Sequence, residues 1–174
     1  MNDPAFVRIR PAVRGDVPAI LAIYNDAVAT STASWDVEPV GLEERLARFD
    51  AQAAAGLPLL VADADGAVLG YATFGPFRPK AGYARTMEHS VYLAPDARGL
   101  GLGRRLMIEL IAAAREAGVH ALVGALDATN VVSLRLHAQL GFVEVGRLPQ
   151  VGAKFGRWLD LVFVQLLLDA DPHP

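Results

Sequence analysis

The stretch DARGLGLGRRL, residues 96–106, places three glycines at alternate positions beside three arginines. It follows a run typical of a strand, residues 86–95, and precedes a run typical of a helix, residues 104–117. The free N–H groups and the dipole at a helix N-terminus bind anions, and the arginines add positive charge at the same place. The stretch predicts either an anion site or a plain surface turn, and its strand-to-helix setting favours the anion site.

Two common phosphate-binding loops do not fit this stretch. The dinucleotide-binding pattern G-x-G-x-x-G begins where a strand ends, but Arg104 stands where the third glycine belongs, and residues 94–98 separate the strand from the glycines. The nucleoside-triphosphate loop G-x-x-x-x-G-K-[ST] needs a Lys-Ser or Lys-Thr pair, which the chain lacks. The pattern that remains is R-x-x-G-x-G, met by Arg98, Gly101 and Gly103.

Length and composition indicate a globular protein without an extended charged field. The 174 residues suffice for one domain with its own core, and 53% of them are apolar. Lys and Arg number 16 against 19 Asp and Glu, so neither nucleic acid nor an anionic membrane is an expected partner. The absence of cysteine excludes disulfides and thiolate metal sites, and His120 and His173 lie outside any ligand spacing, so no metal is expected.

The same composition favours a cytoplasmic protein. The first ten residues lack the basic-then-apolar plan of a signal peptide, and no apolar run approaches the length of a membrane span. We therefore expect a cytoplasmic location.

Apolar periodicity and turn residues predict a mixed α/β fold, with helices packed on a sheet. Asp16 is expected to cap the first helix, and Asp65-Gly66 is the strongest hairpin signal in the chain. The expected helices cover residues 17–29, 42–55, 104–117 and 130–140. The expected strands cover residues 7–10, the two apolar runs of 57–75 on either side of the hairpin turn, 86–95, 120–128, 142–148 and 158–168.

Beyond the glycine stretch, two segments carry a family resemblance. R-x-x-G-x-G and the downstream NVVSLRLHAQLGF, residues 130–142, resemble the GNAT superfamily of N-acetyltransferases. YARTMEHSVYLAP, residues 83–95, is similar to the branch that acetylates phosphinothricin, methionine sulfoximine and methionine sulfone. The resemblance implies a single N-acetyltransferase domain over residues 1–174, with a core at about 6–169 and a mostly antiparallel twisted sheet flanked by helices. It also implies acetyl-CoA as cosubstrate, a role in detoxification and a homodimer.

Glu88 and His137 are the expected catalytic residues. An α-amino group has a pKa of about 7.7–8.0, so a base near it speeds its attack on a thioester. Glu88 lies at the start of the strand that leads to the glycine stretch, which suits that base, and the resemblance favours this over a plain surface carboxylate. His137 stands where most of the superfamily has a tyrosine that protonates the departing thiolate. It is either that acid or a hydrogen-bonded helix residue.

The resemblance also implies which residues contact the cosubstrate and the amino acid. Main-chain groups of the 91–93 segment should run beside the pantetheine arm, and Asn130 combines a helix-cap role with a cofactor contact. Arg78 is expected to bind the substrate carboxylate, in competition with Lys80 and Arg85. The expected cofactor-binding residues are Val91, Tyr92, Leu93, Arg98, Gly99, Leu100, Gly101, Leu102, Gly103, Arg104, Asn130 and Ser133. The expected substrate-binding residues are Arg78, Pro79, Lys80, Glu88, His89 and Ser90.

Two other functions remain open at the level of sequence. One is an acetyltransferase for a protein N-terminus, a polyamine or an aminoglycoside, which Arg78 disfavours if it faces the pocket. The other is a non-catalytic CoA-binding regulatory domain, which would not need Glu88. The sequence does not separate a physiological amino acid from a detoxified analogue, because small side-chain changes alter binding by only about 1–3 kcal/mol.

Overall fold

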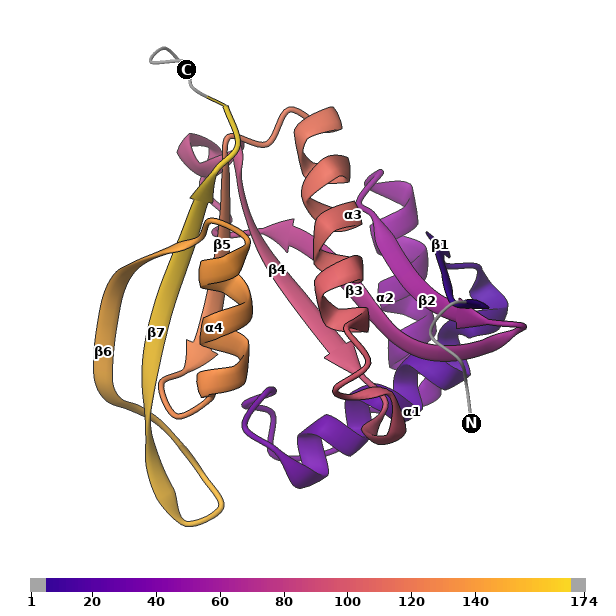
Figure 1. The fold of residues 1–174 in the computed structure, drawn as a ribbon, viewed down its shortest axis with the longest axis horizontal. Helices are drawn as coiled ribbons and strands as arrows, with labels where there is room; N and C mark the ends of the chain where they lie inside the picture. Colours follow the sequence, from indigo (N-terminus) through magenta and orange to yellow (C-terminus); the bar gives the residue numbers. More distant parts are fainter. Residues whose placement is uncertain (1–5, 170–174) are drawn as a thin grey trace. The chain divides into compact units, whose positions relative to one another are not determined.

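The computed structural model describes residues 6–169. Along this part of the chain the elements follow the predicted order of strand, two helices, three strands, helix, strand, helix and two strands (Figure 1). The helices are α1 (Val17–Thr30), α2 (Leu42–Ala54), α3 (Leu102–Glu116) and α4 (Val131–Gln139). The strands are β1 (Arg8–Pro11), β2 (Leu59–Ala64), β3 (Ala67–Pro76), β4 (Thr86–Leu93), β5 (Ala121–Asp127), β6 (Val143–Lys154) and β7 (Arg157–Leu167).

The chain divides into two compact units. Within the described residues, unit 1 comprises residues 6–74 and 90–110, and unit 2 comprises residues 75–89 and 111–169. The hydrogen-bonded strands follow the order β1-β2-β3-β4-β5-β7-β6. β4 and β5 are parallel, whereas the pairs β1–β2, β2–β3, β5–β7 and β6–β7 are antiparallel. The predicted mixed, mostly antiparallel sheet is therefore confirmed. The predicted extent of a single domain over 1–174 stays a prediction.

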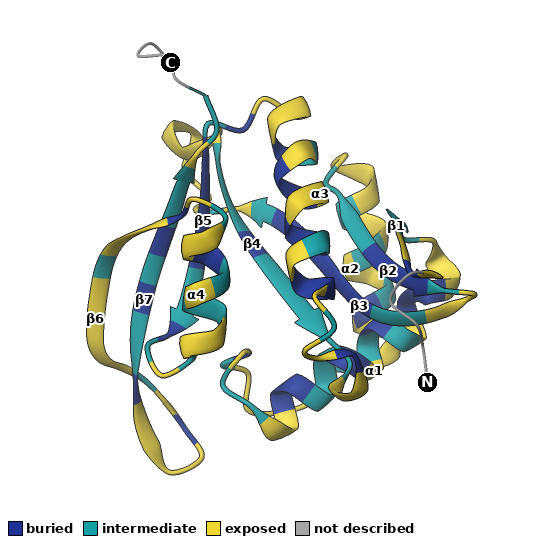
Figure 2. Ribbon diagram, in the orientation of Figure 1, coloured by how far each residue is buried: buried dark blue, intermediate teal, exposed yellow. Residues whose placement is uncertain are grey.

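In unit 1, β2 and β3 form the hairpin that the Asp65-Gly66 pair predicts. Asp65 has φ of 50° and Gly66 has φ of 90°, and this pair of positive angles matches the right-handed twist of the two strands. Apolar residues of the hairpin pack against apolar residues of α1 that recur at helical spacing. Ile20 and Ile23 pack against Val61, and the strands are buried along much of their length (Figure 2).

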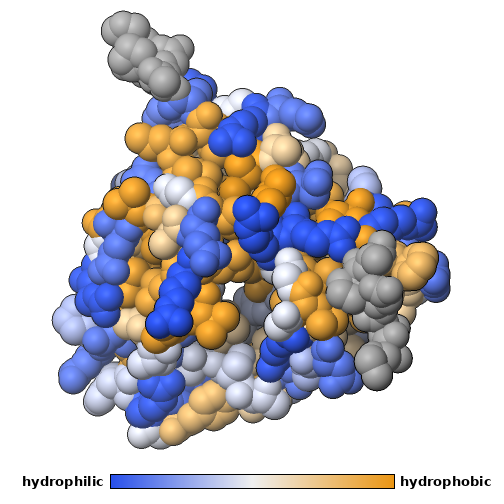
Figure 3. All heavy atoms as spheres, in the orientation of Figure 1, coloured by the Kyte–Doolittle hydropathy of each residue, from blue (hydrophilic) through white to orange (hydrophobic). Residues whose placement is uncertain are grey.

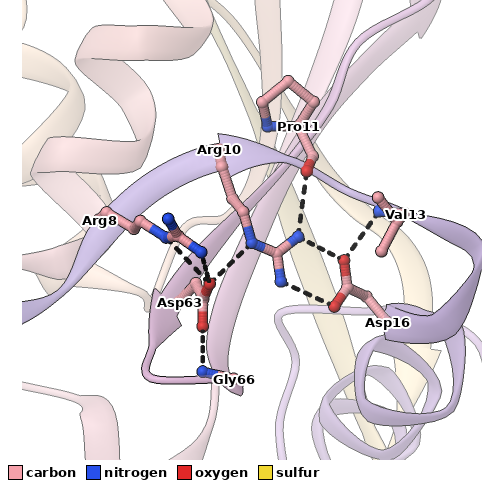
Figure 4. A network of polar contacts seen from close by, with 7 residues as sticks. All are labelled: Arg8, Arg10, Pro11, Val13, Asp16, Asp63 and Gly66. Carbon is pink, nitrogen blue, oxygen red and sulfur yellow. Dashed lines mark hydrogen bonds and ion pairs between the residues drawn. The ribbon is translucent and has the colours of Figure 1, made fainter.

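Two buried carboxylates join β1, β2 and the turn before α1 (Figure 4). Asp63 Oδ2 accepts from Nε of Arg10 at 2.7 Å and from Nε of Arg8 at 3.2 Å. Arg10 also donates through Nη1 and Nη2 to Asp16, at 2.7 and 2.9 Å. These bonds from Arg10 hold the pKa of both aspartates below the ordinary value for Asp.

The prediction that Asp16 caps the first helix is wrong for its side chain. Asp16 occupies the position before α1, but its carboxylate makes no cap bond to that helix. It accepts instead from the backbone N–H of Val13 at 2.8 Å, one turn earlier, and from Arg10. The guanidinium of Arg10 is a charged donor and binds the Asp16 carboxylate more strongly than a neutral helix N–H does, which draws the carboxylate away from the helix terminus.

In unit 2, β5 pairs with β7 and β7 pairs with β6, all antiparallel. Residues Thr86–Glu88 of β4 pair in parallel with Ala121–Val123 of β5. The prediction that the sixth strand ends at 148 is too short, because β6 continues to Lys154. Its register shifts between Glu144 and Gly146 and again between Leu148 and Gly152, and the second irregularity contains Pro149, which cannot donate a ladder hydrogen bond.

The β6–β7 hairpin also carries much exposed apolar surface. Hydrophobic side chains reach the surface among hydrophilic ones on the face displayed in Figure 3. The exposed apolar residues of this hairpin are Val143, Val145, Leu148, Val151, Phe155, Trp158 and Leu167.

Candidate active site

The glycine stretch forms a turn that opens α3. After β4, a 3-10 turn at Pro95–Ala97 leads to Gly99 and Gly101, whose φ angles of 79° and 76° favour glycine. A Cβ at either position would meet no atom within 4 Å, so the space beside these glycines is open. The need for glycine is thus conformational, and a ligand can approach the backbone here.

The helix begins two residues earlier than predicted. Arg105 donates its N–H to the carbonyl of Gly101, so Leu102 and Gly103 lie in the first turn of α3. Gly103 is therefore a helix residue and not part of the loop, which corrects the expectation of a helix starting at 104. Leu102 is buried in the core, and its burial fixes where the helix starts. The N–H groups of this first turn lack partners within the helix and remain available to an anion.

The arginines of the stretch are held in different ways. Arg98 pairs with Asp26 of α1 through an Nη2-to-carboxylate distance of 3.0 Å, with half of its side chain exposed. Arg105 donates to the carbonyl oxygen of Val7. Arg104 is exposed at the start of α3. Positive charge therefore gathers at this helix terminus, as the sequence predicts, although Asp26 offsets part of that on Arg98.

The main chain of residues 91–93 lies at the end of β4, directly before this turn. The N–H of Ala94 donates to the carbonyl of Leu69 in β3 at 2.9 Å. The ring of Tyr92 is buried against Tyr71 and Tyr24, with centroids 5.3 and 5.5 Å away. The cofactor role assigned to this segment concerns its main chain and stays a prediction.

Glu88 combines partial burial with a cationic neighbour. About 37% of its side chain is exposed, and its Oε2 lies 3.9 Å from Nη1 of Arg78. Burial raises the pKa of Glu88, and the positive charge of Arg78 opposes that rise to a smaller extent. A carboxylate with a raised pKa in a half-buried position is the type of group that accepts a proton from an amine.

The remaining predicted substrate residues differ in exposure. Arg78 lies over the ring of Phe77 at 4.1 Å and donates to the carbonyl of Phe77. Pro79 and Lys80 are exposed in the following turn. Arg85, the third candidate for a carboxylate contact, is instead bound to Asp169 and to the carbonyl of Gly118. Among these cations, Arg78 is the one that lies beside Glu88.

His89 and His137 form a buried pair. Their Nε2 atoms are 2.8 Å apart, and the residues are 6% and 1% exposed. Nδ1 of His89 lies 2.8 Å from the carbonyl of Val123, and Nδ1 of His137 lies 2.7 Å from the carbonyl of Ser133. Burial lowers the pKa of His89 to about 3 and also lowers that of His137, against the opposing effect of these carbonyls. All four ring nitrogens face polar atoms inside the protein.

Asn130 caps α4 as expected. Its Oδ1 accepts from the N–H of Ser133 at 3.1 Å, and Ser133 Oγ lies 3.4 Å from Nδ1 of His137. The cap sets the first turn of α4 and so positions the carbonyl of Ser133, which Nδ1 of His137 contacts. Their contacts with the cofactor stay predictions.

A cavity around Arg45 was not anticipated from the sequence. It has a volume of about 170 Å³ and is lined by residues of α1, α2, β2, β3 and β4, all in unit 1. Residues 45, 48, 49 and 52 of α2 face it, at the spacing of one helix face. That face carries two arginines and a glutamine where a core-facing helix is normally apolar, and this departure is a signal that the sequence contained.

The described residues contain no group of three or more His, Asp or Glu that could hold a metal ion. His120 pairs with Asp169, and His173 lies outside the described residues. No helix in residues 6–169 is both long and apolar enough to cross a membrane.

Comparison with known proteins identifies the family. The family model described as the acetyltransferase (GNAT) family matches residues 20–142. The chain belongs to this family. It is 55% identical over 162 residues to an L-methionine sulfoximine/L-methionine sulfone acetyltransferase of Pseudomonas paraeruginosa, covering 92% of this chain and 94% of that one. It is 47% identical over 156 residues to a phosphinothricin N-acetyltransferase of Alcaligenes faecalis, covering 89% and 79%.

A solved structure agrees with this GNAT assignment. An acetyltransferase from Salmonella typhimurium, determined with its cofactor acetyl-CoA, superposes with a TM-score of 0.95 at 46% identity and covers 97% of this chain and 98% of that one. The predicted family, its fold and its N-acetyltransferase class are confirmed. The roles of the individual site residues are not tested by these comparisons.

Proposed function

We propose that this GNAT enzyme transfers the acetyl group of acetyl-CoA to the α-amino group of a small amino acid of the methionine sulfone, methionine sulfoximine or phosphinothricin type. Relatives named for these substrates support the proposal. The observation that carries it is the half-buried Glu88, whose raised pKa suits a base for an amine. A surface carboxylate at a strand start would need neither the burial nor the neighbouring Arg78.

The α3 terminus fits the pyrophosphate of the cosubstrate. Open space beside Gly99 and Gly101, free N–H groups in the first turn and the charge of Arg104 together suit a diphosphate. When bound, acetyl-CoA supplies a thioester that an amine can attack.

In the proposed reaction, Glu88 accepts a proton from the substrate ammonium. At pH 7 only about a tenth of an α-amine with a pKa near 8 is neutral, so a base with a raised pKa increases the reactive fraction at the site. The positive charge of Arg78 opposes the rise in the pKa of Glu88 that burial causes. An N–H of the 91–93 segment is proposed to stabilise the developing oxyanion, as the family resemblance implies.

We propose that His137 does not protonate the leaving thiolate directly. Its ring is 1% exposed, and its two nitrogens face Ser133 and His89. A free thiol has a pKa of about 8.5, so coenzyme A can leave with modest help. Of the two roles left open by the sequence, the burial of His137 supports the hydrogen-bonded helix residue over the direct acid.

The test is an amine panel with acetyl-CoA, in which kcat/KM is measured for methionine sulfone, methionine sulfoximine, phosphinothricin and a polyamine. The amino acids are expected to exceed the polyamine by at least about a hundredfold, because a site built for a carboxylate rejects ligands that lack one. Comparable values for methionine sulfone and the polyamine would contradict the amino-acid assignment. No turnover with any amine would favour a CoA-binding module.

Glu88→Gln tests the proposed base. The variant is expected to lose about 10²–10⁴-fold in kcat/KM at pH 7, since general base catalysis contributes about that much. In the pH profile of kcat/KM, the wild-type enzyme should lose activity on the acidic side at a pH above the ordinary pKa of Glu. This acidic limb should be absent from the profile of the variant. Glu109→Gln on the exposed side of α3 makes the same chemical change and should leave kcat/KM unaltered. Unchanged turnover of Glu88→Gln at every pH would remove Glu88 as the base.

We further propose that the enzyme works in the cytoplasm as a homodimer. The family resemblance and the exposed apolar residues of the β6–β7 hairpin support the dimer. The expected absence of nucleic-acid and membrane partners belongs to the same proposal.

A further inference from the structure

A buried carboxylate lies at the end of β5, within unit 2. The side chain of Asp127 is 0% exposed, whereas Arg157, at the start of β7, is about half exposed and contacts it through Nη2 at 3.4 Å. Burial of a charged group is costly unless hydrogen bonds and an opposite charge compensate it. A carboxylate kept in this position therefore needs further donors directed at it.

The donors come from the segment that follows the strand. Oδ1 of Asp127 accepts from the N–H of Thr129 at 2.9 Å, and Oδ2 accepts from the hydroxyl of the same residue at 2.9 Å. The carbonyl of Asp127 accepts from the N–H of Asn130 at 2.9 Å. The N–H of Ala128 donates to the carbonyl of Asp160 in β7, also at 2.9 Å. Every residue of this short segment is thus tied to the end of β5 or to β7.

The cap of α4 fixes how the side chain of Asn130 is turned. Its Oδ1 accepts from the N–H of Ser133, and because a main-chain N–H only donates, the amide nitrogen of Asn130 points elsewhere. That nitrogen has no hydrogen-bond partner among residues 6–169, so it is available to an acceptor oxygen of a ligand. Val131 and Val132 beside it are 49% and 82% exposed. The first turn of α4 therefore offers a donor next to apolar surface.

We propose that Asp127 is a positioning residue for the cosubstrate: it holds residues 128–130 so that the amide of Asn130 donates to an acceptor oxygen of acetyl-CoA. Asp127 itself touches no ligand, because its side chain is fully buried. The inference rests on the proposed function, in which Asn130 contacts the cosubstrate. The pantetheine arm carries amide carbonyls between alkyl groups, which suit the donor of Asn130 and the exposed valines of α4.

The direction of the bonds separates Asp127 from a carboxylate that joins core elements. Asp63 joins two strands, because its partners Arg8 and Arg10 lie in β1. Both oxygens of Asp127 bond instead to Thr129, which is exposed and only two residues away. Bonds of this kind hold a surface segment in one conformation, as short Asp side chains do in turns. The segment held is the one that leads into α4.

The test measures binding of coenzyme A by titration calorimetry in wild type and three variants. Asp127→Ala removes both acceptors and should raise the Kd at least about tenfold, the effect of losing one hydrogen bond to a charged group. Asp127→Asn keeps an acceptor for the Thr129 N–H and should recover part of the affinity. Asp160→Ala is the matched control, because it removes a carboxylate that accepts from Gln150 but keeps the carbonyl that accepts from Ala128. Its Kd should stay within about twofold of the wild type.

Amide exchange of Ser133 without ligand reports the position of Asn130. In the wild type the cap protects this N–H, and in Asp127→Ala it should exchange at least about tenfold faster, because a displaced Asn130 no longer accepts from it. Asp160→Ala should leave the exchange unaltered. A variant that only lowers stability would instead show a smaller fraction of binding-competent protein with an unchanged Kd.

An unchanged Kd for coenzyme A in Asp127→Ala, or unchanged exchange of Ser133, overturns the assignment. If Asp127→Ala does not fold, Thr129→Val removes one of the two bonds from an exposed residue and should raise the Kd about threefold. An unchanged Kd there also overturns the assignment. Binding of coenzyme A that depends on Asp127, without acetylation of any amino acid, contradicts the proposed function alone. Acetylation of methionine sulfone with a KM for acetyl-CoA that is independent of Asp127 contradicts this inference alone.

Discussion

His89 and His137 share one contact that two neutral rings cannot fully satisfy. Carbonyl oxygens only accept, so the carbonyls of Val123 and Ser133 place a proton on each Nδ1. The facing Nε2 atoms then need a third proton to form a bond, which would give the pair one positive charge. Burial opposes that charge, so the neutral pair leaves one of three bonds unmade at neutral pH.

This arrangement predicts an acid-sensitive fold. The unfolded chain protonates His89 near pH 6.5 and the folded chain only near pH 3, so between these values the unfolded state holds more protons. The free energy of unfolding should therefore fall as the pH drops below 6.5, by up to about 1.4 kcal/mol per pH unit for this one group. Urea unfolding at pH 5 to 8 measures it. His89→Gln should show a shallower slope, and an equal slope in the two proteins would contradict the prediction.

The sequence predicts Glu88, Arg78 and His137 as site residues, but it does not predict the neighbouring groups that shift their pKa values. Glu88 and Arg78 are ten residues apart and were both assigned to the site from a family pattern. The contact of His89 with His137 joins residues 48 apart, and no local periodicity encodes such a distance. Arg45 was missed for a different reason. An arginine on a helix is normally a solvated surface residue, and only the fold shows this one to be buried.

At the scale of elements, local chemistry accounts for what the sequence predicts well. The Asp65-Gly66 turn and the apolar periodicity that predicts α1 each depend on residues close in the chain, and both predictions are confirmed. The start of α3 and the length of β6 depend on tertiary packing. Leu102 extends α3 because it is buried, and β6 continues past Pro149 because β7 pairs with it. Glycine spacing placed the start of α3 too late, at residue 104, and proline placed the end of β6 too early, at residue 148.

Gly124 of β5 shows how tightly one element is fitted to the histidine pair. A Cβ there would lie 2.7 Å from Cε1 of His89 and 3.0 Å from Cγ2 of Val164. His89 is held at both ring nitrogens and cannot move away freely, so Gly124→Ala should lower the free energy of unfolding by about 1–3 kcal/mol. Gly75→Ala in β3 meets no atom within 4 Å and should stay within about 0.5 kcal/mol. Urea denaturation separates them, and equal effects would contradict the crowding argument.

For the molecule as a whole, the small net charge and the exposed apolar surface both favour association between copies of the chain. The formal net charge of −3 is small, which limits electrostatic repulsion between copies of the chain. β6 ends the strand order and is an edge strand, and edge strands with apolar side chains tend to pair with another chain. The valines of β6 are more than half exposed, at 64% for Val143, 56% for Val145 and 52% for Val151.

The proposed dimer gives the last prediction. Sedimentation equilibrium at micromolar concentration should give a mass of twice the 18.5 kDa of one chain. Val145→Lys places a charge on the apolar face of β6 and should shift the protein to the mass of a single chain, because an unpaired charge is costly inside an interface. Val13→Lys introduces the same charge at a valine of matched exposure, 59%, outside the hairpin, and should remain dimeric. A wild type of single-chain mass, or a Val145→Lys variant that stays dimeric, would exclude this face as the interface.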